Sequence, residues 1–414
     1  MRVLIFTASA GNGHNSSAKR ITEKLLENDE NTVIETVDIY KSYASKIKAW
    51  TMETGYFLLC NHCVKLYNYF FKQSERSTVE HKDQSKCNRE IYPIMYGMLK
   101  KIYEFKPDVI VSTYIFGAIA LSNLKRYYNI PAKTVCMCLD YGISPYWECC
   151  TKGLDYMFLT NEEMLPAFKD KGFTDKQLIV TGIPVSDKFN NPPSKKKARE
   201  KLGLATDLFT MVLTTQSFFP IKNKQIFREL AKVKTPIQVI IVNGKNKTCK
   251  REIDKLIKTS NLPHKFISLG FTNKIVEIFS ASDIILGKAG GLFSTEQINV
   301  GLPGLIVDKL PQQEIYNKQY LVDNNCALPV TKDTIADNIN HLISNPSSQE
   351  ILRKSALKIR KPNALVDICN VIAGCPSADY SKINFTDTKR IVIRNVDRKR
   401  KEAIRASKNN KANK

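Results

Sequence analysis

Three short stretches place glycine and polar residues directly after apolar runs, where such residues could bind or activate a substrate. In the first, TASAGNGHNSSA at 7–18, Gly11 and Gly13 flank Asn12 between an expected strand and an expected helix. Glycines there let backbone N–H groups approach a ligand, and a helix N-terminus favours negative charge. His14 begins the helix, where a neutral imidazole could take a proton from a hydroxyl group. The alternative is that His14 only caps or packs the helix.

The second stretch, LGKAGGLFSTEQINVGLPGLIVD at 286–308, repeats the strand, glycine turn and helix. Gly290 and Gly291 would present bare amides at a helix N-terminus, which is a cradle for phosphate. Glu296 lies about one turn later, and a carboxylate there could accept hydrogen bonds from both hydroxyls of a ribose. The plainer interpretation is an ordinary joint with Glu296 as an acid in the first helical turn.

The third stretch, PQQEIYNKQY at 311–320, follows the apolar run GLIVD. Gln313, Glu314 and Asn317 are polar, and at the edge of a sheet they could read the hydroxyls of a sugar. As sequence alone, this stretch is a polar loop.

Apolar runs alternate with helical patterns through two halves of the chain and predict an α/β fold with parallel sheets. The expected strands are 2–8, 33–40, 108–114, 132–140 and 156–160, then 208–215, 237–244, 266–270, 284–287 and 304–308. We therefore expect two doubly wound, Rossmann-like domains facing a central cleft, with ligands at the carboxyl ends of the strands. The expected divisions are a domain at 1–190, a linker at 191–199, a domain at 200–375 and a basic tail at 376–414.

The net charge of +23 favours an anionic partner, namely nucleic acid, an anionic bilayer or a phosphate-bearing substrate. Residues 381–414 hold twelve Lys/Arg and three Asp/Glu, so this tail contributes +9. The tail resembles one ribbon-helix unit of a DNA-binding protein only weakly, since a second helix is missing. We expect it to touch anionic lipid and expect no nucleic-acid partner.

The eleven cysteines are odd in number and follow no apparent signal peptide, which favours free thiols in the cytoplasm. Cys60 and Cys63 form a lone C-x-x-C without a second pair of ligands, so we expect no metal site. No run of about 20 apolar residues predicts a membrane-spanning helix.

Residues 40–72 interleave aromatic side chains with lysines, a pattern suited to a lipid headgroup interface. Aromatic residues at helical spacing also fill protein cores, and the sequence leaves the two interpretations open. The candidate membrane residues are Trp50, Tyr56, Phe57, Tyr69, Phe70 and Phe71.

Taken in order, several motifs give the chain a resemblance over about residues 1–375. They are LIFTASAGNGH, VDIY, KPDVIVST, CLDYGISPYW, VTGIPVSDKF, IVNGKN and GKAGGLFSTEQINVGLPGLIV with QQEIYN. Together they resemble the monogalactosyldiacylglycerol synthases and processive diacylglycerol glucosyltransferases. These enzymes are relatives of the peptidoglycan N-acetylglucosaminyltransferase that acts on lipid I.

The resemblance implies a GT-B fold, an inverting reaction and no essential metal or other cofactor, and the chain contains no D-x-D triplet. It implies that the N-terminal half binds the lipid acceptor and the C-terminal half binds the UDP-sugar. It assigns His14 as the base, Asp140 as its acidic partner, Gly290, Gly291 and Thr295 to the phosphates, Glu296 to the ribose, and Gln313, Glu314 and Asn317 to the sugar.

The expected function is transfer of a hexose from a UDP-sugar to the hydroxyl of diacylglycerol, or of a glycosyldiacylglycerol, by an enzyme bound peripherally to the cytoplasmic face of the cell membrane. The alternatives are transfer of N-acetylglucosamine to a polyprenyl-linked acceptor, or a scaffold that binds nucleotide sugar or membrane without catalysis.

Three positions depart from the family pattern. The loop LTTQSFFPIKN at 213–223 has no glycine where a glycine-rich loop is usual, and Phe218 and Phe219 could crowd a nucleotide. Phe293 replaces a common threonine of the phosphate loop, and Ser144 stands roughly where a histidine is usual.

Overall fold

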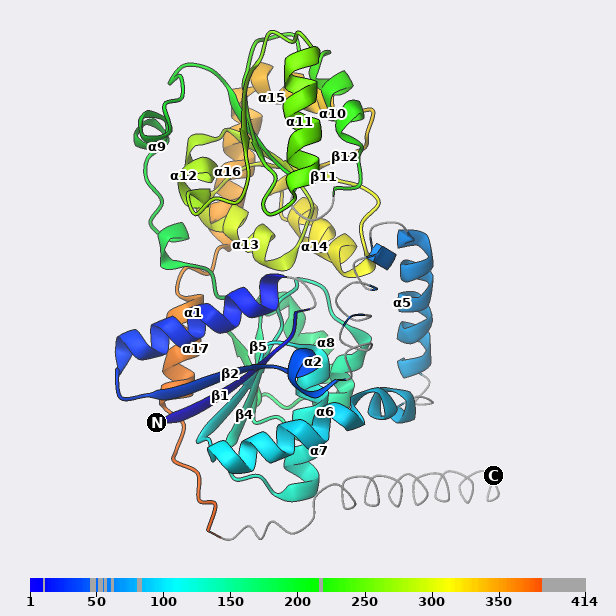
Figure 1. The fold of residues 1–414 in the computed structure, drawn as a ribbon, viewed down its shortest axis with the longest axis vertical. Coiled ribbons are helices and arrows are strands. Elements are labelled where there is room, and N and C mark those ends of the chain that lie inside the picture. The colour runs from blue at the N-terminus through cyan, green and yellow to red at the C-terminus, as the bar shows by residue number, and fades with distance from the viewer. Residues whose placement is uncertain are drawn as a thin grey trace.

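The computed structural model describes residues 1–9, 12–44, 50, 55, 58–60, 63–79, 84–215 and 219–381. Within these ranges the side chains of 12, 74–79, 84–90 and 92–93 are left out. The chain forms two lobes, one above the other in Figure 1, each built around a parallel six-stranded sheet.

The first lobe surrounds a sheet in the order β2-β1-β3-β4-β5-β6. Its strands are β1 (Arg2–Thr7), β2 (Val33–Asp38), β3 (Val109–Ser112), β4 (Lys133–Met137), β5 (Tyr156–Leu159) and β6 (Leu178–Val180). The strand order reverses between β1 and β3, and in sheets of this kind ligands bind beside the carboxyl ends of the strands at that point.

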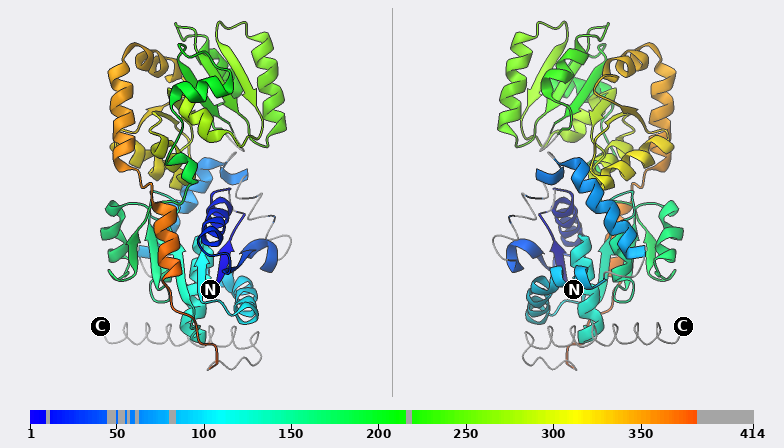
Figure 2. Two further views of the ribbon diagram at one scale, coloured as in Figure 1. Left: turned by 90° about the vertical axis from the view of Figure 1, so that its left-hand side faces the viewer. Right: turned by 90° about the vertical axis from the view of Figure 1, so that its right-hand side faces the viewer.

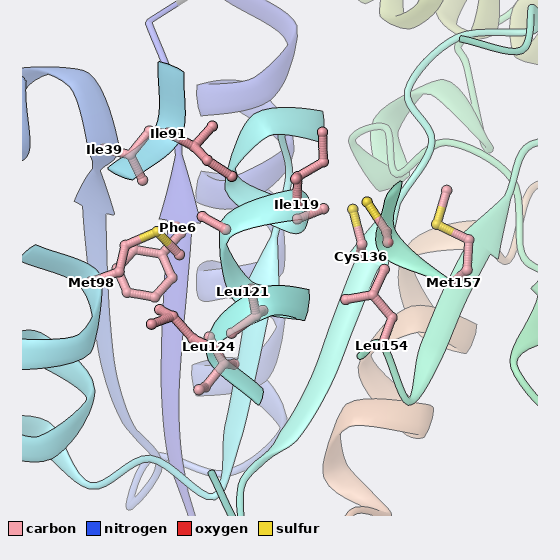
Figure 3. Close-up of a cluster of buried hydrophobic side chains, with 14 of the residues drawn as sticks. Phe6, Ile39, Ile91, Met98, Ile119, Leu121, Leu124, Cys136, Leu154 and Met157 are labelled. Atoms are coloured by element: carbon pink, nitrogen blue, oxygen red, sulfur yellow. The ribbon is translucent and has the colours of Figure 1, made fainter. Parts of the chain in front are cut away.

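Helices cover both faces of the first sheet. They are α1 (Asn12–Asn28), α2 (Ile39–Tyr43), α5 (Val64–Val79), α6 (Gln84–Phe105), α7 (Ile115–Tyr128) and α8 (Leu165–Asp170), with short 3₁₀ turns η2 (Pro145–Cys150) and η3 (Glu162–Met164). Figure 3 shows the core between the sheet, α6 and α7, where Phe6, Met98 and Leu121 are fully buried. Strands buried on both faces explain the continuous apolar runs of the sequence.

The second lobe has the strand order β12-β11-β10-β7-β8-β9. Its strands are β7 (Thr210–Thr214), β8 (Gln238–Val242), β9 (Lys265–Leu269), β10 (Ile284–Gly287), β11 (Gly304–Val307) and β12 (Ala327–Val330). This is the Rossmann order, with its reversal between β7 and β10. The ten expected strands are confirmed, and the structure adds β6 and β12, one at an edge of each sheet.

The helices of the second lobe place its glycine turn on the side that faces the first lobe (Figure 1). They are η4 (Asp187–Phe189), α9 (Lys195–Leu202), α10 (Asn223–Leu230), α11 (Lys247–Thr259), α12 (Ile275–Ala281), α13 (Gly291–Val300), α14 (Gln312–Asp323), α15 (Ile335–Ser344) and α16 (Pro346–Ile359). Arg199 is buried and bonds the Ala281 carbonyl and the Asp283 carboxylate, so α9 is a packed part of this lobe and the expected linker at 191–199 is shorter.

The last described helix, α17 (Ala364–Ala373), returns to the first lobe and lies against α1 (Figures 1 and 2). Leu365, Ile368 and Ile372 are buried in the same cluster as Val3 and Ile5 of β1. The expected second domain, 200–375, therefore does not coincide with the second lobe, because its apolar end covers the face of the first sheet.

Beyond α17, residues 376–381 run along the first lobe. The Ala378 amide donates to Asp108, and the Tyr380 hydroxyl donates to the Pro107 carbonyl. These contacts hold the start of the basic tail at the amino ends of the strands, away from the cleft. The helices described here include none long and apolar enough to cross a membrane.

Candidate active site

His14 lies in the first turn of α1, at the carboxyl end of β1. Its Nδ1 is 2.5 Å from the carbonyl oxygen of Thr113, which follows β3, and its ring meets Tyr114 edge-on with centroids 4.9 Å apart. A carbonyl only accepts, so Nδ1 carries the hydrogen and Nε2 carries the lone pair. Burial lowers the pKa of His14 below its ordinary value of 6.5, although the bond to Thr113 opposes this shift. The ring is therefore neutral near pH 7, as a base requires.

Gly13, in the first turn of α1, faces the second lobe. A Cβ added at Gly13 would lie 3.9 Å from the Cβ of Leu292 on α13. Asn12 begins α1, and Gly11 lies outside the described residues. The first turns of α1 and α13 thus meet across the boundary between the lobes.

The turn at 290–291 joins β10 to α13 and is pressed against the first lobe. Gly290 caps the helix with φ −71°, and a Cβ added at Gly291 would lie 1.8 Å from the Leu139 carbonyl oxygen and 3.1 Å from Oδ1 of Asp140. Only glycine permits this approach of the two backbones. The predicted phosphate cradle therefore opens toward the lobe that carries His14.

Asp140 follows β4 and is held from the other lobe by Asn317. Nδ2 of Asn317 donates to Oδ1 of Asp140 at 2.8 Å and to the Ala289 carbonyl at 2.8 Å, while its Oδ1 accepts from the Tyr141 amide at 2.6 Å. Burial raises the pKa of Asp140, the bond from Asn317 lowers it, and the charge of Glu314 adds to the rise. Asn317 is fully buried and joins the lobes in this structure.

Thr295 and Glu296, on the first turns of α13, also contact the first lobe. The Thr295 hydroxyl donates to the Gly291 carbonyl at 2.9 Å and lies 2.9 Å from the hydroxyl of Tyr141. Glu296 forms an ion pair with Arg20 of α1 at 2.9 Å. Burial raises the pKa of Glu296, and the attraction of Arg20 opposes this effect.

The two remaining residues of the predicted sugar set lie at the start of α14. Gln313 accepts a hydrogen bond at Oε1 from the hydroxyl of Tyr67 on α5, at 2.7 Å. Oε1 of Glu314 accepts from Lys288, which follows β10, at 3.0 Å. Oε2 of Glu314 is buried without a hydrogen-bond partner among the described residues, so this carboxylate can still accept from a ligand hydroxyl.

The partners Arg20, Tyr67 and Tyr141 were missed by sequence reasoning. Tyr141 directly follows Asp140, and Arg20 lies six residues after His14. Their closeness in the sequence to predicted site residues could have indicated both of them. Tyr67 lies far from every glycine motif and carries no such signal.

The structure describes two of the three departures from the family pattern. The Phe293 ring turns into its own lobe, edge-on to Phe279 with centroids 5.8 Å apart and packed over Gly287, where an added Cβ would lie 2.7 Å from the ring. It therefore does not fill the cradle. Ser144 caps η2 by accepting from the Tyr146 amide at 3.4 Å. Of the loop at 213–223, residues 216–218 lie outside the described residues, and Phe219 packs against the lobe core.

The gathered groups can carry out proton abstraction beside an anion site. A neutral imidazole lies in the first turn of α1 in one lobe, and the N-terminus of α13 in the other lobe lies against Gly13, Leu139 and Asp140. Within the described part of the chain, no three His, Cys, Asp or Glu side chains are placed to hold a metal ion, and the ten cysteines whose side chains are described are free thiols.

Two family models match the chain, one in each half. Residues 14–185 match monogalactosyldiacylglycerol (MGDG) synthase, and residues 213–365 match the glycosyltransferase family 28 C-terminal domain. The processive diacylglycerol beta-glucosyltransferase of Staphylococcus saprophyticus is 25% identical over 89% of this chain and 91% of its own. That of Bacillus licheniformis is 22% identical over 87% of this chain and 92% of its own.

Solved structures share the fold. MurG of Acinetobacter baumannii aligns with TM-score 0.57 and 13% identity, over 90% of this chain and 99% of its own. HepE of Anabaena in complex with UDP aligns with TM-score 0.52 and 16% identity, over 90% of this chain and 98% of its own. The UDP-GlcNAc 2-epimerase of Neisseria meningitidis aligns with TM-score 0.58 and 16% identity, over 90% of this chain and 100% of its own.

Two doubly wound lobes that face each other across their strand ends define a GT-B protein. The two family models fall in order on the two lobes, so the chain combines a monogalactosyldiacylglycerol synthase domain with a glycosyltransferase family 28 C-terminal domain, and it is similar to the processive diacylglycerol glucosyltransferases over most of its length.

Proposed function

We propose that this protein transfers a hexose from a UDP-sugar to the hydroxyl of diacylglycerol or a glycosyldiacylglycerol, with inversion, at the cytoplasmic surface of a membrane. The observation that carries the proposal is the placement of the Gly290–Gly291 turn against the lobe that carries His14. The relatives named as diacylglycerol glucosyltransferases support the choice of acceptor.

His14 acts as the base toward the acceptor hydroxyl. Because the Thr113 carbonyl holds the hydrogen on Nδ1, Nε2 can accept the proton as the acceptor oxygen attacks the anomeric carbon. Asp140, which is buried against the Gly291 turn, is assigned as the acidic partner that stabilises the positive charge which forms on the imidazole. Attack from the face opposite the departing UDP inverts the anomeric carbon.

The leaving UDP gains negative charge on its β-phosphate. Backbone amides at Gly290 and Gly291 and the N-terminus of α13 stabilise this charge without a requirement for a cation. In this structure the Leu139 carbonyl and Asp140 lie against the same turn, so donor binding requires the lobes to part there. Glu296 then exchanges Arg20 for the ribose hydroxyls, and Gln313 and Glu314 contact the hexose.

Membrane contact is assigned to the segment around α5. Among the described residues, Trp50, Leu58, Leu66, Tyr69 and Phe70 each expose between 44% and 59% of their surface. Lys65 and Lys72, seven residues apart, flank this apolar face of α5 and are exposed. Apolar rings beside ammonium groups suit a bilayer with anionic headgroups, and the net charge of +23 adds attraction. Tyr56 and Phe57 lie outside the described residues, and Phe71 is half-buried.

The test is transfer of radiolabel from UDP-glucose or UDP-galactose to diacylglycerol or to a polyprenyl-linked acceptor presented in vesicles. We expect label in diacylglycerol. His14→Ala should lower turnover by about 10²–10⁴-fold, the usual contribution of a positioned base, and leave vesicle binding unchanged. Label that entered only the polyprenyl lipid would refute the acceptor assignment.

One observation favours the second candidate, a scaffold that binds membrane without catalysis. The lobes are joined across the cleft by Arg20–Glu296 and by Asn317, in the places the donor would use. A protein that bound vesicles and transferred no sugar from any UDP-sugar would support this candidate.

A further inference from the structure

Helix α5 has two faces with different surroundings. Leu66, Tyr69 and Phe70 form its outer face, with exposed fractions of 47%, 58% and 58%. Tyr67 and Asn68 are half-buried on the inner face. The outer face is the one assigned to the membrane above, so the inner face determines what else a membrane-bound α5 contacts.

The inner face contacts the other lobe at the start of α14 (Figure 1). Tyr67 donates to Oε1 of Gln313 at 2.7 Å, and Nδ2 of Asn68 donates to the carbonyl of Leu310 at 3.0 Å. Leu310 is buried and directly precedes Pro311, the residue that caps α14. One bond therefore holds a side chain of the predicted sugar set, and the other holds the backbone that carries it.

The bond from Tyr67 sets the direction of the Gln313 amide. The amide is planar, so fixing Oε1 toward the Tyr67 hydroxyl also fixes the direction in which Nε2 points. A side chain held in one orientation loses less conformational freedom when it binds a sugar hydroxyl. Tyr67 can thus affect affinity for the hexose without touching it.

We propose that Tyr67 is a positioning residue for the donor sugar, and that contact of the outer face of α5 with a lipid surface strengthens donor binding through the Tyr67–Gln313 bond. The inference rests on the proposed function, because it takes Gln313 to contact the hexose. The two faces belong to one 16-residue helix, so restraining the outer face restrains the inner face as well.

The first experiment compares the affinities for UDP-glucose and UDP by calorimetry. Tyr67→Phe removes the hydroxyl and keeps the ring. It should weaken the affinity for UDP-glucose about two- to tenfold, the usual effect of one hydrogen bond, and leave the affinity for UDP unchanged. Tyr156→Phe, the same change at the amino end of β5, is the matched control and should alter neither affinity. Gln313→Ala removes the contact itself and should weaken UDP-glucose binding at least as much as Tyr67→Phe, and adding Tyr67→Phe to Gln313→Ala should cause no further loss.

The second experiment adds vesicles of equimolar phosphatidylcholine and phosphatidylglycerol, without diacylglycerol. Vesicles should tighten UDP-glucose binding by the wild type and have no such effect on Tyr67→Phe.

Equal UDP-glucose affinities for wild type and Tyr67→Phe, an equal loss of UDP affinity in Tyr67→Phe, or a wild type insensitive to vesicles would each overturn the inference alone. A wild type that bound neither nucleotide would overturn the proposed function and the inference with it.

Discussion

At the scale of single residues, the proposed mechanism depends on the protonation state of His14. The Thr113 carbonyl selects the tautomer, and burial keeps the ring neutral by lowering its pKa from 6.5. A neutral ring is the active form in the proposed mechanism, which predicts that activity is lost as the pH falls through this lowered pKa.

We therefore expect kcat/KM to fall on the acid side with a midpoint below pH 6.5. Initial rates of sugar transfer between pH 4.5 and 8 would measure it, with vesicle binding followed in the same buffers as a control. A midpoint above 6.5 would contradict the assignment of His14 as a buried neutral base.

Asn317 is the second residue whose chemistry can be tested directly. Asn317→Asp keeps the shape and replaces the donor facing Asp140 with an acceptor, so two carboxylates oppose each other across the lobes. We expect the free energy of unfolding to fall by about 1–3 kcal/mol near neutral pH, which would be seen as a lower melting temperature. The loss should shrink as the pH falls, because protonation of either carboxyl restores a donor.

Thermal melts at pH 5 and pH 8 would measure this dependence. Asn370→Asp, on the exposed face of α17, is the matched control and should melt like the wild type at both values. A melting difference independent of pH would speak against facing carboxylates.

The sequence singles out residues on both sides of the boundary between the lobes, but not the side chains that contact them. His14, Asp140 and Glu296 stand out by type and motif, whereas Arg20 and Tyr67 contact the site only because the lobes meet. Local spacing carries no information about which side chain of one lobe faces which side chain of the other. For this reason Asn317 was expected to read a sugar, and its contacts with Asp140 and Tyr141 could not be foreseen.

At the scale of elements, the joint between β10 and α13 is the most constrained. Gly291→Ala would place a methyl group 1.8 Å from the Leu139 carbonyl oxygen and 3.1 Å from Asp140, so the lobes must move apart. In the proposed mechanism the donor phosphates replace the Leu139 carbonyl at this turn, so the methyl group would also displace the phosphates. A shift of about 1 Å in reacting groups can cost about 10²-fold in rate, and we expect a loss of at least this order.

Small-angle scattering should show a larger radius of gyration for Gly291→Ala in the absence of ligand. Gly290→Ala is the control for lobe approach, because its Cβ would have no neighbour nearer than 4.0 Å and its φ is −71°. Its scattering should match the wild type. Equal radii for Gly291→Ala and the wild type would argue against the close contact.

Two strands escaped prediction for a common reason. β6 has three residues and β12 has four, including Pro329, and each lies at the edge of its sheet. Edge strands tolerate proline, since one side of their backbone needs no ladder bonds. Short length and proline weaken the apolar pattern that predicts a strand. In the other ten strands this pattern was strong enough for prediction.

At the scale of the whole molecule, α17 links the end of the second lobe back to the first lobe. Its apolar side chains Leu365, Ile368 and Ile372 cover the first sheet, so a chain ending at residue 363 would expose them as a vacant face. Burial of such side chains stabilises by about 1.5–3 kcal/mol each, which sums to about the stability of an ordinary domain.

We expect a chain ending at 363 to lose the thermal transition of the first lobe, and a chain ending at 381 to melt like the full chain. Differential scanning calorimetry would separate the two. A cooperative first-lobe transition in the shorter chain would show that α17 is dispensable.

The alternation of strands and helices sufficed to predict two lobes, but not the path between them. A helical segment at 333–375 was expected, and the structure has helices there. Its last helix is apolar enough to serve either lobe, so only the three-dimensional path of the chain shows that it serves the first.

This path has a consequence for how the protein is made. The first lobe emerges from the ribosome early, yet the helix that completes it is translated only after the whole second lobe. Until α17 is synthesised, the apolar face of the first sheet stays exposed to solvent. During that interval the nascent first lobe is the part of the chain most in need of a chaperone.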